Sequence, residues 1–302
     1  CRMDNRSAPC LLRRPARASM PMPHNSLLQP GMKGYPHDAQ AMTCSEIAAR
    51  GWNVLADDLP LPLAVIKRRA LEHNVGWLQG QARAWGIDLA PHGKTTMSPQ
   101  LFQRQLQAGA WGITFATVTQ LRVGVAAGVR RALIANQVVA SADLAELQRM
   151  RRADPALRVV FLVDSSAQLA LIEAFVAARP AVLPFEVMLE IGVPGGRTGC
   201  RDEAQALALA EQLHRSPAVR LVGIECYEGL AAKGQDETDG PYAQALMDRV
   251  EQVAQACAVR GWFDDDEVLV SAGGSAIFDL VAPRLRVALG RPVRALLRSG
   301  CY

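Results

Sequence analysis

A lysine in the run HGKTT, residues 92–96, is the side chain of this sequence with the most evident chemical potential. The apolar residues before it predict a short strand over 87–93, and Ser98-Pro99 predicts an N-cap and the first turn of a helix. Lys94 is therefore expected at the carboxyl end of a strand, pointing to the same side as His92. A Schiff-base nucleophile would be placed at this edge of a parallel sheet or barrel, although most lysines at loop edges are only solvated.

Three later segments carry glycines or an arginine at the expected ends of strands. The loop 190–199 contains four glycines and Arg197, but it lacks the G-x-G-x-x-G spacing of dinucleotide-binding loops. The run SAGGS, residues 271–275, precedes a helix expected to begin near Ala276, and backbone N–H groups there could approach a phosphate. The run RSGCY, residues 298–302, follows the last expected strand. Arg197 is read either as a ligand-binding residue or as a salt-bridged surface arginine.

The elements that must position these residues alternate regularly along the chain. Short apolar segments predict strands, and the segments between them have the apolar stripe of amphipathic helices. Eight such repeats favour an α/β fold of the TIM type, a (β/α)8 barrel, over a doubly wound open sheet. The strands are expected near residues 87–93, 111–117, 131–136, 158–163, 184–191, 219–226, 267–271 and 293–298. Helices are expected between them, for example over Ala142–Arg152, Ser166–Ala178, Glu203–Arg215 and Tyr242–Arg260.

The composition excludes several classes of protein. Half of the 302 residues are apolar, which is enough for a sizeable core, and the net charge is +4 with arginines scattered along helices, which gives no support for a nucleic-acid partner. No apolar run reaches the length of about eighteen residues that a membrane span needs. The seven cysteines lack C-x-x-C spacing and read as reduced thiols of a cytoplasmic protein. None of the five histidines has a partner at metal-ligand spacing, so no metal site is predicted within the sequence.

The first 26 or so residues differ in character from the rest. They are rich in Arg, Pro and Met and show no period, and Arg13-Arg14 is not followed by the apolar region of a signal sequence. Met20 is one candidate start of the protein. We therefore expect residues 1–40 to form a largely disordered extension and residues 41–302 to form the barrel.

The lysine motif also carries a resemblance to a known family. Pro91-His-Gly-Lys-Thr95 resembles the pyridoxal-phosphate (PLP) enzymes of the D-serine dehydratase and D-threonine aldolase family, relatives of alanine racemase. The longer run 89–101, continued by 105–112, is most similar to the bacterial amino acid deaminase or D-serine deaminase-like branch. The resemblance implies the alanine racemase N-terminal barrel, which is fold type III among PLP enzymes, with Lys94 as the Schiff-base and catalytic lysine. It implies these cofactor-binding residues: Lys94, Arg197, Tyr227, Ser275, Gly274, Gly300 and Cys301.

The same resemblance implies a reaction and further parts. The implied activity is that of a PLP-dependent lyase, a D-serine ammonia-lyase or amino acid deaminase that converts a D-serine-like substrate to a 2-oxo acid and ammonia. Family members continue into a C-terminal β domain with zinc ligands, so this chain is expected to be a fragment of a homodimeric enzyme. Cys301 stands where threonine is common, so a side-chain bond to the phosphate is in doubt there while the backbone contact remains.

Several alternatives stay open at this point. A D-threonine aldolase-type retro-aldol cleavage would use the same lysine, and a non-catalytic PLP-binding barrel would use the same cofactor site. His92 is read either as a neighbour of the cofactor or as a hydrogen-bonded histidine of the barrel lumen. Glu225 and Glu228, near the end of the sixth expected strand, could be acid/base groups, but nothing in the sequence raises them above carboxylates of the barrel rim.

Overall fold

The computed structural model describes residues 27–179, 181–229 and 232–302, and it divides the chain into two compact units, Cys1–Ala64 and Val65–Tyr302. Most of the extension expected over residues 1–40 lies outside the described residues. The boundary expected at residue 40 falls within the first unit.

The described part of the first unit contains a helix and a short helical turn. Helix α1 (Cys44–Arg50) begins with a capping box, in which the Thr43 side chain accepts from the Glu46 N–H and the Glu46 carboxylate accepts from the Thr43 N–H. The turn η2 (Val54–Ala56) follows. The rings of Tyr35 and Trp52 meet edge to face, with centroids 5.9 Å apart. The buried apolar side chains of this unit are Tyr35 and Met42, within its described part.

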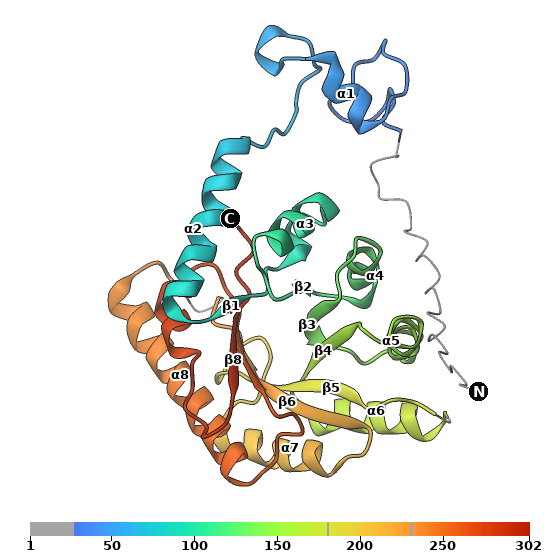
Figure 1. Ribbon diagram of the computed structural model, residues 1–302. Helices are drawn as coiled ribbons and strands as arrows, with labels where there is room; N and C mark the ends of the chain where they lie inside the picture. Colours follow the sequence, from blue (N-terminus) through green and yellow to red (C-terminus); the bar gives the residue numbers. More distant parts are fainter. Residues whose placement is uncertain (1–26, 180, 230–231) are drawn as a thin grey trace, which may run out of the picture. The chain divides into compact units, whose positions relative to one another are not determined.

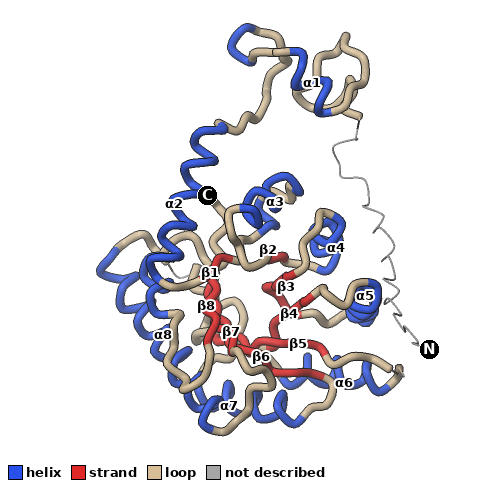
Figure 2. The backbone as a smooth tube through the Cα atoms, in the orientation of Figure 1, coloured by secondary structure: helices blue, strands red, loops and turns tan. Residues whose placement is uncertain are grey.

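The second unit is a barrel of eight parallel strands (Figures 1 and 2). The strands pair in the order β1-β8-β7-β6-β5-β4-β3-β2. The ring closes between β1 and β2, because the Trp111 N–H donates to the Leu89 carbonyl at 2.8 Å and the Thr114 N–H donates to the Pro91 carbonyl at 2.9 Å. The strands are β1 (Asp88–Leu89), β2 (Ile113–Phe115), β3 (Arg131–Gln137), β4 (Arg158–Val163), β5 (Phe185–Ile191), β6 (Val219–Cys226), β7 (Val268–Ala272) and β8 (Val293–Leu297).

Helices surround this ring on the outside, as Figure 2 shows. Their apolar faces pack against the outer face of the strands, and a second, smaller apolar cluster fills the lumen with residues such as Leu133, Met188 and Leu269. The barrel interior is therefore a packed core, and its ends are the places open to a ligand. The helices are α2 (Arg68–Trp85), α3 (Pro99–Gln107), α4 (Val118–Ala126), α5 (Ser141–Ala153), α6 (Ser166–Ala177), α7 (Glu203–Arg215), α8 (Asp236–Val259) and the short α9 (Phe278–Val281), with the turns η3 (Gly93–Thr95) and η4 (Ala282–Arg284).

The barrel and its eight strands are confirmed, and the differences from expectation are local. The first strand is shorter than 87–93 and ends at Leu89. Helix α8 begins at Asp236 rather than Tyr242, with Pro241 inside it. The helix expected near Ala276 begins at Phe278 and has four residues, so it offers no substantial helix N-terminus to a phosphate.

The membrane and disulfide expectations can be compared with the helices and cysteines of the structure. Over the described residues, no helix is long and apolar enough to cross a membrane. The described cysteines are free thiols, and they are Cys44, Cys200, Cys226, Cys257 and Cys301. Cys1 and Cys10 lie outside the described residues.

Candidate active site

A cavity of about 210 Å³ lies at the carboxyl ends of the strands. Its wall is formed by turns that follow β1, β5, β6, β7 and β8, which is the end of a barrel where binding sites occur. Every residue that the sequence predicts for the cofactor contributes to this wall. They are Lys94, Arg197, Tyr227, Gly274, Ser275, Gly300 and Cys301. The structure thus brings the predicted residues together, and the role of each stays a prediction.

Lys94 reaches the cavity from a helical turn rather than from a strand. Pro91 and Gly93 follow the short β1, and the chain then folds into η3 (Gly93–Thr95), so alternation along a strand is not what aligns Lys94 with His92. Glycine is needed at 93, because a Cβ there would lie 2.8 Å from the Phe102 ring and 2.9 Å from Ile113. Partial burial, with the neighbouring Arg197 and Arg298 guanidinium groups, lowers the pKa of Lys94 below its usual value. A larger fraction of neutral amine is therefore present at a given pH.

Arg197 lies against the ring of Tyr227, with its guanidinium carbon 4.3 Å from the ring centroid. The loop that carries Arg197 is closed at its base, where the Gly192 N–H donates to the Cys200 carbonyl and the Cys200 N–H donates to the Glu190 carbonyl. The buried Glu190 carboxylate accepts from the hydroxyl of Thr198 and the amide of Gln137. Arg197 and Tyr227 also line a second hollow of about 350 Å³ beneath the glycine-rich loop. The pair therefore forms a shared wall of the two spaces.

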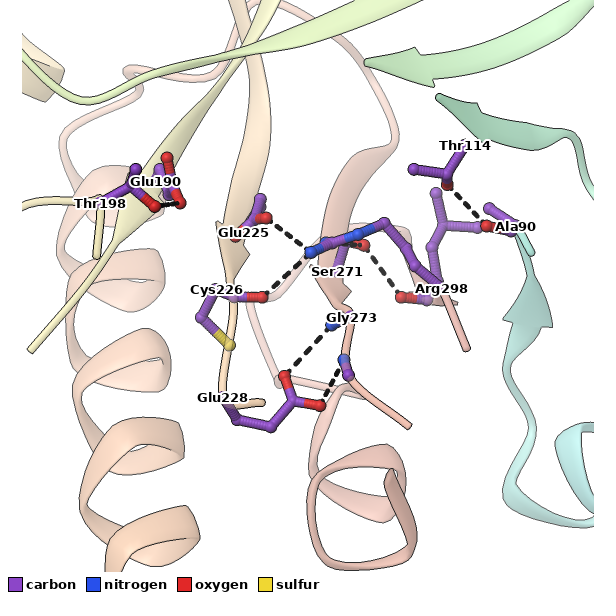
Figure 3. Close-up of polar contacts among 12 residues, drawn as sticks. Ala90, Thr114, Glu190, Thr198, Glu225, Cys226, Glu228, Ser271, Gly273 and Arg298 are labelled. Carbon is purple, nitrogen blue, oxygen red and sulfur yellow. Dashed lines mark hydrogen bonds and ion pairs between the residues drawn. The ribbon is translucent and has the colours of Figure 1, made fainter. Parts of the chain in front are cut away.

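The floor of the cavity is a buried ion pair that the sequence did not predict. Arg298 is 2 % exposed, and it donates to Glu225 Oε1 at 2.6 Å and to Ser271 Oγ at 2.8 Å (Figure 3). Glu225 is 1 % exposed, so its interpretation as a rim carboxylate is wrong. Burial raises the pKa of Glu225 above its usual value, the positive charge of Arg298 opposes that rise, and the nearby Glu190 adds to it.

Glu228 is also buried rather than at the rim, and it contacts the turn after β7. Its carboxylate accepts from the N–H groups of Gly273 at 3.2 Å and Gly274 at 2.5 Å (Figure 3). Burial raises the pKa of this carboxyl above its usual value, while the two N–H groups and Arg298 act in the opposite direction. The N–H of Gly274 therefore already has a partner within the protein.

His92 lies beside Lys94 in the same cavity. Burial lowers the pKa of its ring to about 3, and the positive charges of Lys94 and Arg298 act in the same direction. The ring is therefore neutral at physiological pH. Within the described part of the chain, three buried side-chain atoms lack a hydrogen-bond partner, and all belong to residues that line this cavity: His92 Nδ1, Glu225 Oε2 and Arg298 Nε.

These features fit pyridoxal phosphate. An amine of lowered pKa stands in the cavity, and residues that line the cavity carry polar atoms without a partner in the protein. Glycine at 300 lets the turn after β8 approach the backbone of His92, since a Cβ there would lie 2.5 Å from the backbone nitrogen of His92. Over residues 27–179, 181–229 and 232–302, no three metal-ligating side chains of His, Cys, Asp or Glu gather as a metal site.

Comparison with known proteins identifies the family. Residues 66–292 match the family model described as alanine racemase, N-terminal domain. The chain belongs to the alanine racemase N-terminal domain family. The family that the lysine motif suggested is thereby shown, and the matched range covers the barrel from the start of α2 to the residue before β8.

Two curated relatives of this chain are named for reactions on D-amino acids. The chain is 33% identical over 169 residues to a D-threonine aldolase from Arthrobacter sp, covering 56% of this chain and 43% of that protein. It is 33% identical over 210 residues to D-threo-3-hydroxyaspartate dehydratase from Delftia sp. (strain HT23), covering 67% of this chain and 53% of the relative. The chain therefore spans about half the length of the curated relatives it matches.

Solved structures show the same fold. The D-threonine aldolase from Filomicrobium marinum superimposes with a TM-score of 0.68 at 23% identity, over 80% of this chain and 62% of that one. The dehydratase from Delftia sp. HT23 superimposes with a TM-score of 0.66 at 28% identity, over 79% of this chain and 60% of that one. The family member described here thus has the barrel of both structures.

Proposed function

We propose that this chain is the PLP-binding barrel of a lyase that acts on D-amino acids with a β-hydroxyl group, removing the hydroxyl from a D-serine-like substrate to give a 2-oxo acid and ammonia. One observation carries the proposal: Lys94 lines a single cavity together with the arginine, the tyrosine and the glycine turns expected to hold the cofactor. The dehydratase relative, matched over 67% of this chain, supports the choice of reaction.

Lys94 has two tasks in this proposal. Its amine, with a lowered pKa, would hold the cofactor through the cofactor's aldehyde group, and as a free amine it would take the α-proton of the substrate onto Nζ. When bound, pyridoxal phosphate supplies an electron sink for the charge left on the α-carbon. Neutral His92 adds no further positive charge beside this amine.

The other residues bind and orient. Arg197 is a fixed cation next to the Tyr227 ring, and it can stabilise negative charge on a ring oxygen of the cofactor. Ser275, Gly300 and Cys301 lie at the ends of β7 and β8 and are proposed to hold the phosphate through backbone N–H groups. Expelling hydroxide is difficult without a Lewis acid, so a divalent metal such as zinc is part of the proposal.

Retro-aldol cleavage is the second candidate, because the other curated relative is a D-threonine aldolase. Product analysis separates the two. The protein saturated with pyridoxal phosphate and zinc should release pyruvate and ammonia from D-serine, and the L-enantiomer serves as control. Glycine and acetaldehyde from D-threonine would instead indicate the aldolase. Bound cofactor with no product from either substrate would indicate a non-catalytic PLP-binding barrel.

A further inference from the structure

The turn Gly273–Ser275 after β7 is held by side chains from both neighbouring strand ends. From the β6 side, the Glu228 carboxylate accepts from the N–H groups of Gly273 and Gly274. From the β8 side, the Ser299 hydroxyl donates to the Gly274 carbonyl at 2.6 Å. The peptide groups on both sides of Gly274 are therefore fixed by buried side chains.

The two glycines of this turn are required by those contacts. A Cβ at residue 274 would lie 2.5 Å from Glu228 Oε1 and 3.2 Å from the Cα of Gly229, both in the segment after β6. A Cβ at residue 273 would lie 2.5 Å from the guanidinium carbon of Arg298. The sequence suggested that glycine stands here so that a phosphate can approach the backbone. In the structure, the side chains of Glu228 and Arg298 occupy the space that the missing Cβ atoms leave.

The N–H groups near this turn have different partners. The N–H groups of Gly273 and Gly274 point to Glu228, so the backbone groups left to face an anion in the cavity are those of Ser275 and, across the opening, of Gly300 and Cys301. A carboxylate that accepts hydrogen bonds from two successive N–H groups fixes the orientation of the peptide that follows them. A turn that is already ordered binds an anion without the entropic cost of ordering it first.

We propose that Glu228 is a positioning residue for the phosphate of the cofactor: by binding Gly273 and Gly274 it orients the turn so that Ser275 faces the phosphate. The inference rests on the proposed function, because it takes pyridoxal phosphate as the ligand of the cavity. It assigns a task to a buried carboxylate that neither binds nor releases a proton in the proposed reaction. Glu228 acts on the phosphate only through the turn.

The test compares two ligands that differ in the phosphate alone. Pyridoxal carries the same ring and aldehyde as pyridoxal phosphate but has a hydroxyl in place of the phosphate ester. Equilibrium binding of each to the full 302-residue chain is measured by absorbance, with wild type, Glu228→Gln and Glu186→Gln. Glu186 is a matched control, since its carboxylate lies in β5 and pairs with Arg158 at 2.7 Å, away from the cavity wall.

Glu228→Gln keeps the size of the side chain but presents an NH₂ group to one of the two backbone donors. We expect its affinity for pyridoxal phosphate to fall at least about tenfold, the scale of a lost hydrogen bond to a charged group, and its affinity for pyridoxal to change less than about threefold. Glu186→Gln should leave both affinities at the wild-type values. If Glu228→Gln does not fold, Ser299→Ala removes the other tether and should lower the preference for pyridoxal phosphate by about threefold to tenfold.

The remaining outcomes overturn the inference in distinguishable ways. An equal loss for both ligands would place Glu228 in support of the fold as a whole, and an increased preference for the phosphate would mean that its charge opposes the ligand. Unchanged affinities would remove it from the cofactor site. A wild-type chain that binds neither ligand would overturn the proposed function as well. A wild-type chain that binds both, with Glu228→Gln indistinguishable from it, would overturn only the role of Glu228.

Discussion

Acidification should destabilise the folded chain through the partly buried ring of His92. In the folded chain the pKa of this ring is about 3, against an ordinary value of 6.5 in an unfolded chain. Between these values the unfolded chain binds a proton that the folded chain does not bind, so the free energy of unfolding falls as the pH falls below 6.5. At pH 5 the unfolded ring is mostly charged and the folded ring is neutral. The resulting loss is about 2 kcal/mol relative to pH 8, from about 1.4 kcal/mol per pKa unit.

Urea unfolding, followed by tryptophan fluorescence at pH 8 and pH 5, measures this loss. Carboxylates also titrate in this range, so the comparison is with His92→Gln, which should lose about 2 kcal/mol less than wild type between the two pH values. His73→Gln, which removes an exposed histidine of α2, is the matched control and should follow wild type. Equal losses in wild type and His92→Gln would refute the account of His92 as a neutral ring in the folded chain.

Two substitutions test the cavity wall and the barrel. Arg197→Ala removes the cation beside Tyr227, and we expect cofactor retention or turnover to fall at least about tenfold, the scale of a lost charge-assisted contact; unchanged cofactor affinity and turnover would remove Arg197 from the site. Gly223→Ala places a Cβ against the Leu269 carbonyl group, 2.8 Å from the carbonyl carbon, so β6 and β7 must separate. Urea unfolding should show a fall of about 1–3 kcal/mol in the free energy of unfolding. Gly76→Ala, in α2 with nothing within 4 Å of the added Cβ, is the matched control and should be neutral or stabilising by up to about 1 kcal/mol. Equal stability of Gly223→Ala and wild type would contradict the close approach of the two strands.

The barrel was predictable because its strands are short apolar runs. Parallel strands covered on both faces read as continuous apolar segments, and β4 and β6 match the ranges expected for them, 158–163 and 219–226. The first strand was overestimated because Pro91 has no N–H for the ladder and the chain turns at Gly93. The helix expected near Ala276 begins two residues later, at Phe278, and it ends after four residues, since Pro283 lies just beyond it and the chain continues as the turn η4.

The polar floor of the site was not predictable from local patterns. Glu225 pairs with an arginine 73 residues away, and Glu228 binds glycines 45 and 46 residues away. Nothing near these glutamates in the sequence distinguishes a buried carboxylate from one at the rim. One signal was available: Glu225 is the last but one residue of β6 and Glu228 follows that strand, at the carboxyl end of the barrel where ligand sites gather. The lysine motif could be found because its residues are consecutive in the sequence. The other residues of the cavity were predicted from the resemblance of the chain to the PLP enzyme family.

The central claim is that Lys94 binds the cofactor covalently, and peptide mapping tests it directly. The protein is loaded with pyridoxal phosphate, reduced with borohydride and digested, and the modified peptide is sequenced by mass spectrometry. The account predicts the reduced cofactor on Lys94 and its loss in Lys94→Ala. Label on Lys33, Lys67 or Lys233, or label that persists in Lys94→Ala, would contradict it.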